Sequence, residues 1–271
     1  MPLYEDEIRS VEGRSLCHSP WQLGLFVSRP VSWAHIRVMR APIRFSTAPH
    51  DAKWYGTILQ PLIYVNNVAL AASVYPGWRT ARVRWDPNEA RLRRLLRDRP
   101  SSVIFYTWHT YILLIVCAFK GFPADLKPTG IGHDGFRSRA VQQTVTWFGC
   151  PVWAYRRTSP VRPKQQLADY LAGSRRIVGL FPDAGGPEGE MRPGIVEVAR
   201  ETNSLLVPMV VAARPMATVR APQRLCLPLP FSSVRAYWDE PIAGDEATVN
   251  RCRTALERLE ARAVSSRGTD Q

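Results

Sequence analysis

The feature that most constrains this chain is a regular alternation of short apolar runs with helical patterns, which begins near residue 102. The runs are rich in β-branched and aromatic side chains, as expected of buried strands. Strands that alternate with helices predict an α/β fold with a mostly parallel sheet flanked by helices. The predicted strands are Val103–Tyr106, Val152–Tyr155, Ile177–Phe181, Leu205–Val211 and Val234–Tyr237, and the predicted helices are Ser138–Phe148, Pro163–Ala172, Pro193–Glu201 and Glu246–Val264.

The length of 271 residues allows one large α/β domain with an N-terminal extension, or two small domains. We expect an extension over residues 1–100, an α/β domain over 101–264 and a short tail over 265–271. Within the extension, the apolar and charge patterns predict an apolar helix at about 54–76 and a basic helix at about 79–99.

The two longest apolar stretches need separate interpretations. The stretch 54–76 is long enough to cross a bilayer, but amide side chains and a proline interrupt it. A membrane-surface or re-entrant helix, a buried helix and a transmembrane span all remain open for it. The stretch 103–119 is interrupted by polar residues around its histidine. A strand followed by a buried helix is therefore favoured over a transmembrane span.

The charge of the chain predicts an anionic partner. Lysine and arginine number 36 against 23 acidic residues, which gives a net charge of +13, and most of the cations are arginines. Arginine favours flat, bidentate contact with phosphate or carboxylate. Nucleic acid, an acidic membrane face, a phosphorylated substrate and an acidic carrier protein are all compatible with this charge.

The cysteines and the N-terminus indicate a reducing, cytoplasmic setting. The five cysteines are odd in number and contain no C-x-x-C pair, so neither a disulfide framework nor a zinc thiolate site is predicted. Positions 5–7 are acidic where a signal peptide would be basic, and secretion is therefore not expected. The cysteines are Cys17, Cys117, Cys150, Cys226 and Cys252.

His109 is the first candidate for chemistry, because it follows an apolar strand and parallel sheets bind ligands where their strands end. It can be a general base, since its pKa lies near neutrality, or a hydrogen-bonded structural histidine. Asp134 and Asp183 are the carboxylates available to orient it. Either aspartate can instead cap the helix that it precedes.

Two further loops follow predicted strands. Arg156, Arg157, Thr158 and Ser159 come after Val152–Tyr155 and form a candidate phosphate clamp, or a solvated pair of cations. The loop after Ile177–Phe181 holds Asp183 and three glycines, whose backbone N–H groups can approach a phosphate or an oxyanion. A plain connecting loop is the alternative there. The glycines are Gly185, Gly186 and Gly189.

Several familiar enzyme classes are not supported. The segment 130–135 matches G-x-G-x-x-G, but a poor strand precedes it and no acidic residue lies between 136 and 168 to hold a ribose. The patterns of P-loop NTPases, α/β-hydrolases and zincins are absent from the sequence.

Taken in order, these segments resemble the lysophospholipid acyltransferase superfamily, in particular its bacterial branch long labelled a domain of unknown function. The resemblance covers about residues 100–262. The chain has Leu114 where the commoner His-x-x-x-x-Asp pattern of the superfamily has an acid, and Ala184 alters the Pro-Asp-Gly-Pro loop. The matching segments are Trp108-His109, Asp134-Gly135, 149–159, 182–189, Gly194-Ile195, 207–209, 227–232 and 240–242.

The resemblance implies a glycerolipid acyltransferase-like fold and the transfer of a fatty acyl group from a thioester to a lipid hydroxyl. The donor would be acyl-coenzyme A or acyl carrier protein, and the acceptor a lysophospholipid or related lipid. His109 would be the base and Asp134 its orienting carboxylate. The substrate- and phosphate-binding residues would be Arg156, Arg157, Thr158, Ser159, Asp183, Gly185, Gly186 and Gly189.

The same resemblance implies no metal and no cofactor besides the thioester co-substrate. An anionic membrane surface and an acyl carrier protein are the expected partners, nucleic acid is not, and the cytoplasmic side of the inner membrane is the expected location. The alternative is a non-catalytic basic protein that keeps the fold and binds lipid or anionic surfaces.

Overall fold

The computed structural model describes residues 53–133, 139–156, 158–184, 187–221 and 223–266. Most of these residues lie in helices or strands. The helices are α3 (Lys53–Thr80), α4 (Glu89–Asp98), α5 (Ile112–Ala118), α6 (Arg139–Trp147), α7 (Pro163–Leu171), α8 (Gly194–Glu201) and α9 (Val249–Ser265). The strands are β1 (Arg82–Asp86), β2 (Val103–Tyr106), β3 (Thr129–His133), β4 (Val152–Tyr155), β5 (Ile177–Leu180), β6 (Leu205–Ala221) and β7 (Gln223–Trp238).

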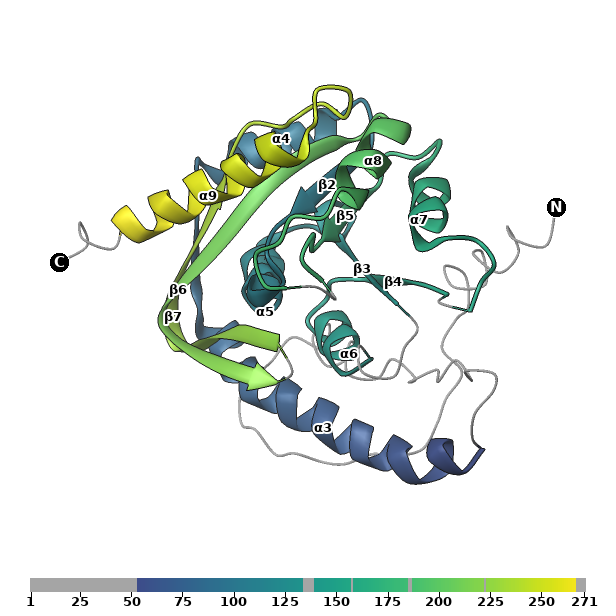
Figure 1. Ribbon diagram of the computed structural model, residues 1–271. Helices are drawn as coiled ribbons and strands as arrows, with labels where there is room; N and C mark the ends of the chain where they lie inside the picture. Colours follow the sequence, from purple (N-terminus) through teal and green to yellow (C-terminus); the bar gives the residue numbers. More distant parts are fainter. Residues whose placement is uncertain (1–52, 134–138, 157, 185–186, 222, 267–271) are drawn as a thin grey trace. The chain divides into compact units, whose positions relative to one another are not determined.

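Within the described residues, seven strands form one sheet in the order β1-β7-β6-β2-β5-β3-β4. Neighbouring strands are parallel except for β6 and β7, which form a long antiparallel hairpin. Helices α7, α8 and α9 cover one face, and α3, α5 and α6 lie on the other (Figure 1). The predicted α/β class with a mostly parallel, helix-flanked sheet is therefore confirmed.

Strand β2 explains why the sheet has a core on each face. All four of its residues are buried. Val103 and Phe105 belong to the core beneath α3, α5 and α6, whereas Ile104 and Tyr106 belong to the core beneath α7, α8 and α9. Side chains alternate between the two faces of a strand, so a strand covered on both sides is a continuous apolar run.

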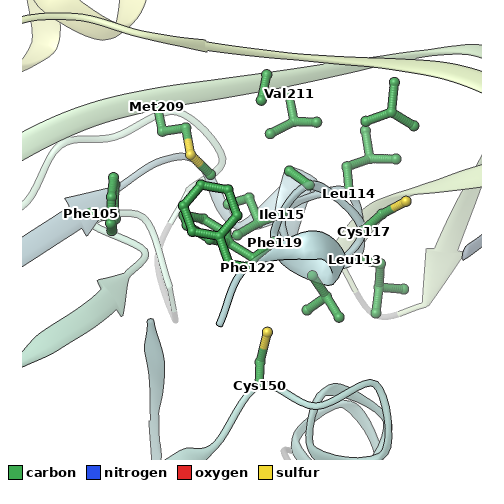
Figure 2. Packing of buried hydrophobic residues seen from close by; sticks show 14 of the residues in the cluster. Phe105, Leu113, Leu114, Ile115, Cys117, Phe119, Phe122, Cys150, Met209 and Val211 are labelled. Atoms are coloured by element: carbon green, nitrogen blue, oxygen red, sulfur yellow. The ribbon is translucent and has the colours of Figure 1, made fainter. Parts of the chain in front are cut away.

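Helix α5 lies inside the first of these cores. Its residues 113–118 are all buried. Figure 2 shows side chains leaving the helix in different directions, toward Met209 and Val211 of β6 on one side and toward Cys150 on another. A helix that is apolar all round is expected only in a core. The predicted strand and buried helix within 103–119 are confirmed.

The structure differs from the predicted basic helix over 79–99, because β1 occupies the first part of that segment. Arg82 and Arg84 are exposed, whereas Val83 and Trp85 pack against the core. This alternation has the period of a strand, and the many arginines obscured it. Helix α4 then begins after Asn88 and is shorter than predicted.

Helix α3 spans the predicted apolar segment 54–76 and packs its C-terminal part against the hairpin and α6. Its Tyr75 and Trp78 rings lie 6.4 and 5.1 Å from the ring of Phe148, measured between centroids. In the parts of the chain that the structure describes, no helix combines the length and the apolar character that a membrane crossing requires. Val65 and Val68 of α3 are exposed.

We expect Gly77→Ala to destabilise the protein. A Cβ atom at Gly77 would lie 1.8 Å from the carbonyl oxygen of Pro228, so α3 would have to move away from β7. Overpacking of this kind costs about 1–3 kcal/mol, which exceeds the gain of about 1 kcal/mol from replacing a helical glycine. Urea denaturation measures the change. Gly121→Ala is the matched control, because a Cβ there meets nothing within 4 Å. Equal stability of the two variants would contradict the close packing.

Candidate active site

Two loops meet where the neighbouring parallel strands β2 and β5 end. Tyr106 is the last residue of β2 and Leu180 is the last residue of β5, and the two residues pair with each other. The N–H group of Thr107 then donates to the Leu180 carbonyl oxygen at 3.3 Å. The chain segments 107–109 and 181–183 therefore leave the sheet side by side. This edge is where open parallel sheets form their ligand sites.

The buried carboxylate of Asp183 joins the two loops. Its side chain is 2% exposed. One oxygen accepts a hydrogen bond from the backbone N–H of His109 at 2.8 Å, and the other accepts from the backbone N–H of Gly189 at 3.4 Å. A buried carboxylate needs such donors, because an unpaired charge away from water is costly. Asp183 thereby fixes the backbone of His109 relative to β5.

The imidazole of His109 is suited to accept a proton. Burial lowers the pKa of His109 below its ordinary value of 6.5, and the negative charge of Asp183 partly opposes this effect. The ring is therefore mostly neutral at pH 7, which is the form that a general base requires. The Phe181 ring packs edge-on against it, with 5.6 Å between the centroids.

Two buried polar atoms near this position have no hydrogen-bond partner among the described residues. They are Nδ1 of His109 and the hydroxyl oxygen of Thr107, whose side chain is 2% exposed. Buried polar atoms are nearly always paired, so both atoms retain the capacity to bond a water molecule or a polar group of a substrate. Thr107 directly follows a predicted strand, which marks it as a position to inspect, but a hydroxyl residue after a strand is common and nothing else in the sequence points to this role.

An apolar crevice lies beside Phe181, between α5, α6, β3 and β5. Its free volume is about 50 Å³. Gly130 and Gly179 form part of its wall, and their lack of side chains leaves the space between the strands open. Gln142 also lines it, but the amide of Gln142 is engaged with the carbonyl oxygen of His133 at 2.9 Å. The crevice therefore suits a short length of hydrocarbon.

The predicted phosphate clamp lies at the same end of the sheet but farther along it. Strand β4 is separated from β5 by β3, so the chain after Tyr155 leaves the sheet roughly 10 Å from the end of β5. The backbone N–H of Arg156 donates to Gln166 at 3.0 Å, and the Ser159 hydroxyl accepts from the N–H of Val161 at 3.1 Å. Thr158 is exposed.

Four of the predicted site residues lie outside the described residues. Of the predicted glycines, Gly189 is described, with a φ of +79° and its N–H group directed to Asp183. The four residues outside are Asp134, Arg157, Gly185 and Gly186.

The cysteines of the described residues are buried and free. Burial raises the pKa of the Cys117 thiol to about 11 and that of the Cys150 thiol to about 12. Both thiols are protonated at neutral pH and are poor nucleophiles. Within the described ranges, no group of three or more His, Cys, Asp or Glu side chains could hold a metal ion.

Comparison with known proteins finds a curated sequence relative and solved structures of similar fold. The chain is 26% identical over 145 residues to an uncharacterized protein of Rickettsia prowazekii (strain Madrid E). The match covers 52% of this chain and spans 64% of the length of the Rickettsia protein. The chain is similar to the crystal structure of the 1-acyl-sn-glycerophosphate acyltransferase PlsC from Thermotoga maritima, with a TM-score of 0.41, 12% identity and 86% coverage of both chains. No family model matches the sequence.

We expect the depressed pKa of His109 to weaken the folded protein in mild acid. The unfolded chain takes up a proton near pH 6.5, and folded His109 does so only at lower pH, so stability falls as the pH drops through 6.5. Removing the imidazole with His109→Gln should flatten that part of the profile and leave the profile above pH 7.5 parallel to wild type. Urea denaturation between pH 5.5 and 8 measures this. Parallel profiles throughout would contradict a buried, neutral His109.

Proposed function

We propose that the protein is an acyltransferase that moves a fatty acyl group from an acyl thioester to a hydroxyl of a lysophospholipid or related lipid. The observation that carries the proposal is the neutral, half-buried His109 at the end of β2, with its backbone held by the buried Asp183 at the end of β5. The resemblance of the ordered segments to the lysophospholipid acyltransferase superfamily supports the same reaction.

The reaction uses His109 twice. A ring nitrogen removes the proton from the acceptor hydroxyl as its oxygen attacks the thioester carbonyl carbon. The carbon–sulfur bond then breaks, and the thiolate takes the proton from the imidazolium. A thiol has a pKa near 8.5, so its thiolate leaves without a strong acid. The charge of Asp183 favours the imidazolium form that lasts between the two transfers.

The remaining predicted residues have supporting roles in this proposal. Asp134 orients the imidazole, and the backbone N–H groups of Gly185 and Gly186 stabilise the oxyanion of the tetrahedral intermediate. Thr158, Ser159 and the two preceding arginines bind a phosphate of the acceptor or the donor. The apolar crevice takes the acyl carbons next to the thioester, since Phe181 borders both the crevice and His109.

The net charge of +13 fits an acyl carrier protein or an anionic membrane on the cytoplasmic side of the inner membrane as the partner. The reaction as proposed uses the acyl thioester as its co-substrate and requires no metal or bound cofactor.

Mass spectrometry of the products tests the proposal. Purified protein is incubated with acyl-coenzyme A or acyl carrier protein thioesters and a panel of lysolipids. We expect an acylated lipid, and we expect His109→Ala to lower its rate by about 10²–10⁴-fold, the usual contribution of a general base. Circular dichroism confirms that the variant is folded. Tight lipid binding without product from any acceptor would instead favour the non-catalytic lipid-binding alternative.

Filling the crevice should change the preference for the acyl chain. A Cβ at Gly179 would approach Pro128 no closer than 3.9 Å, so Gly179→Ala fits without strain and occupies part of the crevice. We expect kcat/KM for longer acyl donors to fall about tenfold relative to the shortest donor that is accepted. Gly121→Ala is the control, because it faces open space. An unchanged ratio would remove the crevice from the acyl site.

A further inference from the structure

The β6–β7 hairpin carries a large bulge that displays an aromatic ring to solvent. Arg214 pairs with Ser233 and Met216 pairs with Pro228, so residues 229–232 of β7 face only residue 215 of β6. Phe231 lies in this bulge with a φ of +63°, and it is 75% exposed. A positive φ is strained for a bulky residue, and such strain is concentrated at functional sites.

The bulge is held firmly in this strained form. The backbone N–H of Phe231 donates to the hydroxyl of Thr80, at the end of α3, at 2.7 Å. The hydroxyl of Ser232 donates to the carbonyl oxygen of Pro215 at 2.6 Å and also contacts that of Leu229. The structure therefore fixes the loop while leaving Phe231 and Leu229 exposed, at 75% and 38%. We call residues 229–231 the Phe231 loop.

Arginines gather on the sheet surface next to this loop. Arg82 of β1 and Arg214 of β6 both pair with Ser233, and all three residues are exposed. One row further along, Arg84 lies directly opposite Arg235. Paired residues point to the same face, so four arginines share a surface of roughly 10 by 7 Å between backbone positions. We call Arg82, Arg84, Arg214 and Arg235 the arginine face.

Helix α9 covers the sheet next to the arginine face but not the face itself. Two residues after Arg84 on β1, Asp86 pairs with Tyr237, which is buried in the core that includes α9. Asp86 also accepts a hydrogen bond from Arg262 of α9 at 2.5 Å, and the arginine face lies on the side of this pair away from α9.

The arginine face lies toward the same end of the sheet as His109. Strand β6 is parallel to β2, and Tyr106, the last residue of β2, pairs with Pro208 of β6. Arg214 follows farther along β6, beyond the end of β2. A planar partner bound to the arginine face and the Phe231 loop would therefore approach the end of the sheet that holds the candidate active site.

We propose that the arginine face and the Phe231 loop dock on an anionic lipid bilayer, with the guanidinium groups of Arg82 and Arg84 at lipid phosphates and the Phe231 ring among the acyl chains. Arginine beside an exposed aromatic and aliphatic tip is the composition of an interfacial membrane site. A single-stranded nucleic acid would need several aromatic platforms, and Phe231 is the exposed aromatic among the large apolar side chains of the described residues. The proposal deepens the proposed function, because it names how the enzyme would reach a lipid acceptor.

Vesicle sedimentation with the full chain tests the docking surface. The vesicles are phosphatidylcholine alone, or phosphatidylcholine with phosphatidylglycerol. We expect binding to the anionic vesicles at least tenfold tighter than to the neutral ones and weakened by salt. The double variant Arg82→Gln/Arg84→Gln should lose roughly thirtyfold in affinity, since each arginine near an anionic surface contributes about fivefold. Arg94→Gln/Arg97→Gln on α4 is the matched control, because it removes the same charge from two other exposed arginines and should change binding by less than threefold.

A second variant tests the ring. Phe231→Asn removes the aromatic side chain and keeps a residue that tolerates a positive φ, so the loop should retain its shape. We expect it to weaken binding to anionic vesicles by about tenfold. Unchanged binding by this variant, equal loss in the two double-arginine variants, or tighter arginine-dependent binding of single-stranded DNA would each overturn the proposal.

The assay also distinguishes this proposal from the proposed function. His109→Ala should bind vesicles like wild type. Arg82→Gln/Arg84→Gln should retain turnover of a water-soluble, short-chain acceptor and lose it for an acceptor embedded in vesicles. Vesicle binding without any turnover would support the docking surface and count against acyl transfer, and turnover without vesicle binding would do the reverse.

Discussion

The candidate site depends on the parallel pairing of β2 with β5, and on one hydrogen bond that extends this pairing past the strand ends. The pairing brings the last residues of both strands level, and the Asp183 carboxylate then holds the backbone N–H of His109 at 2.8 Å. This bond holds the histidine beside the ring of Phe181, which also lines the apolar crevice.

Much of this arrangement was predictable, because central strands of a parallel sheet are buried on both faces and appear in the sequence as continuous apolar runs. Strands β2 and β4 have the predicted bounds, and β5 is one residue shorter than predicted. His109 was identifiable because it directly follows such a strand. The sequence left two aspartates, Asp134 and Asp183, as possible neighbours of His109. It does not show whether β3 or β5 lies next to β2 in the sheet, so it could not decide between them. The hydrogen bond from a backbone N–H group leaves no pattern in the side chains.

The missed elements have physical explanations as well. Strand β3 contains Gly130 and Gly132, whose weak strand preference concealed it, and the G-x-G-x-x-G letters there begin within a strand instead of in a strand-to-helix turn. The β6–β7 hairpin is longer than the predicted runs. On β6 the apolar pattern fades after Ala213, because Arg214, Thr218 and Val219 are exposed. On β7 the outer half still holds buried residues, among them Leu225 and Leu227, but two prolines interrupt the pattern. The bulge at Phe231 depends on a contact with Thr80, which lies far away in the sequence.

The topology also sets an order for folding. Among the strands that the structure describes, β1 pairs with β7 alone, and Arg82 lies opposite Ser233, near the other end of the domain. During synthesis, the segment up to β5 is therefore complete long before β7. Until β7 has left the ribosome, β1 lacks the strand with which it pairs in the described fold. Contacts of such long sequence separation form slowly, and exposed strand edges invite wrong partners. Charged residues alternate along β1, and charge on an exposed strand edge disfavours wrong pairing, so we expect the arginines of β1 to protect the nascent chain before the fold is complete.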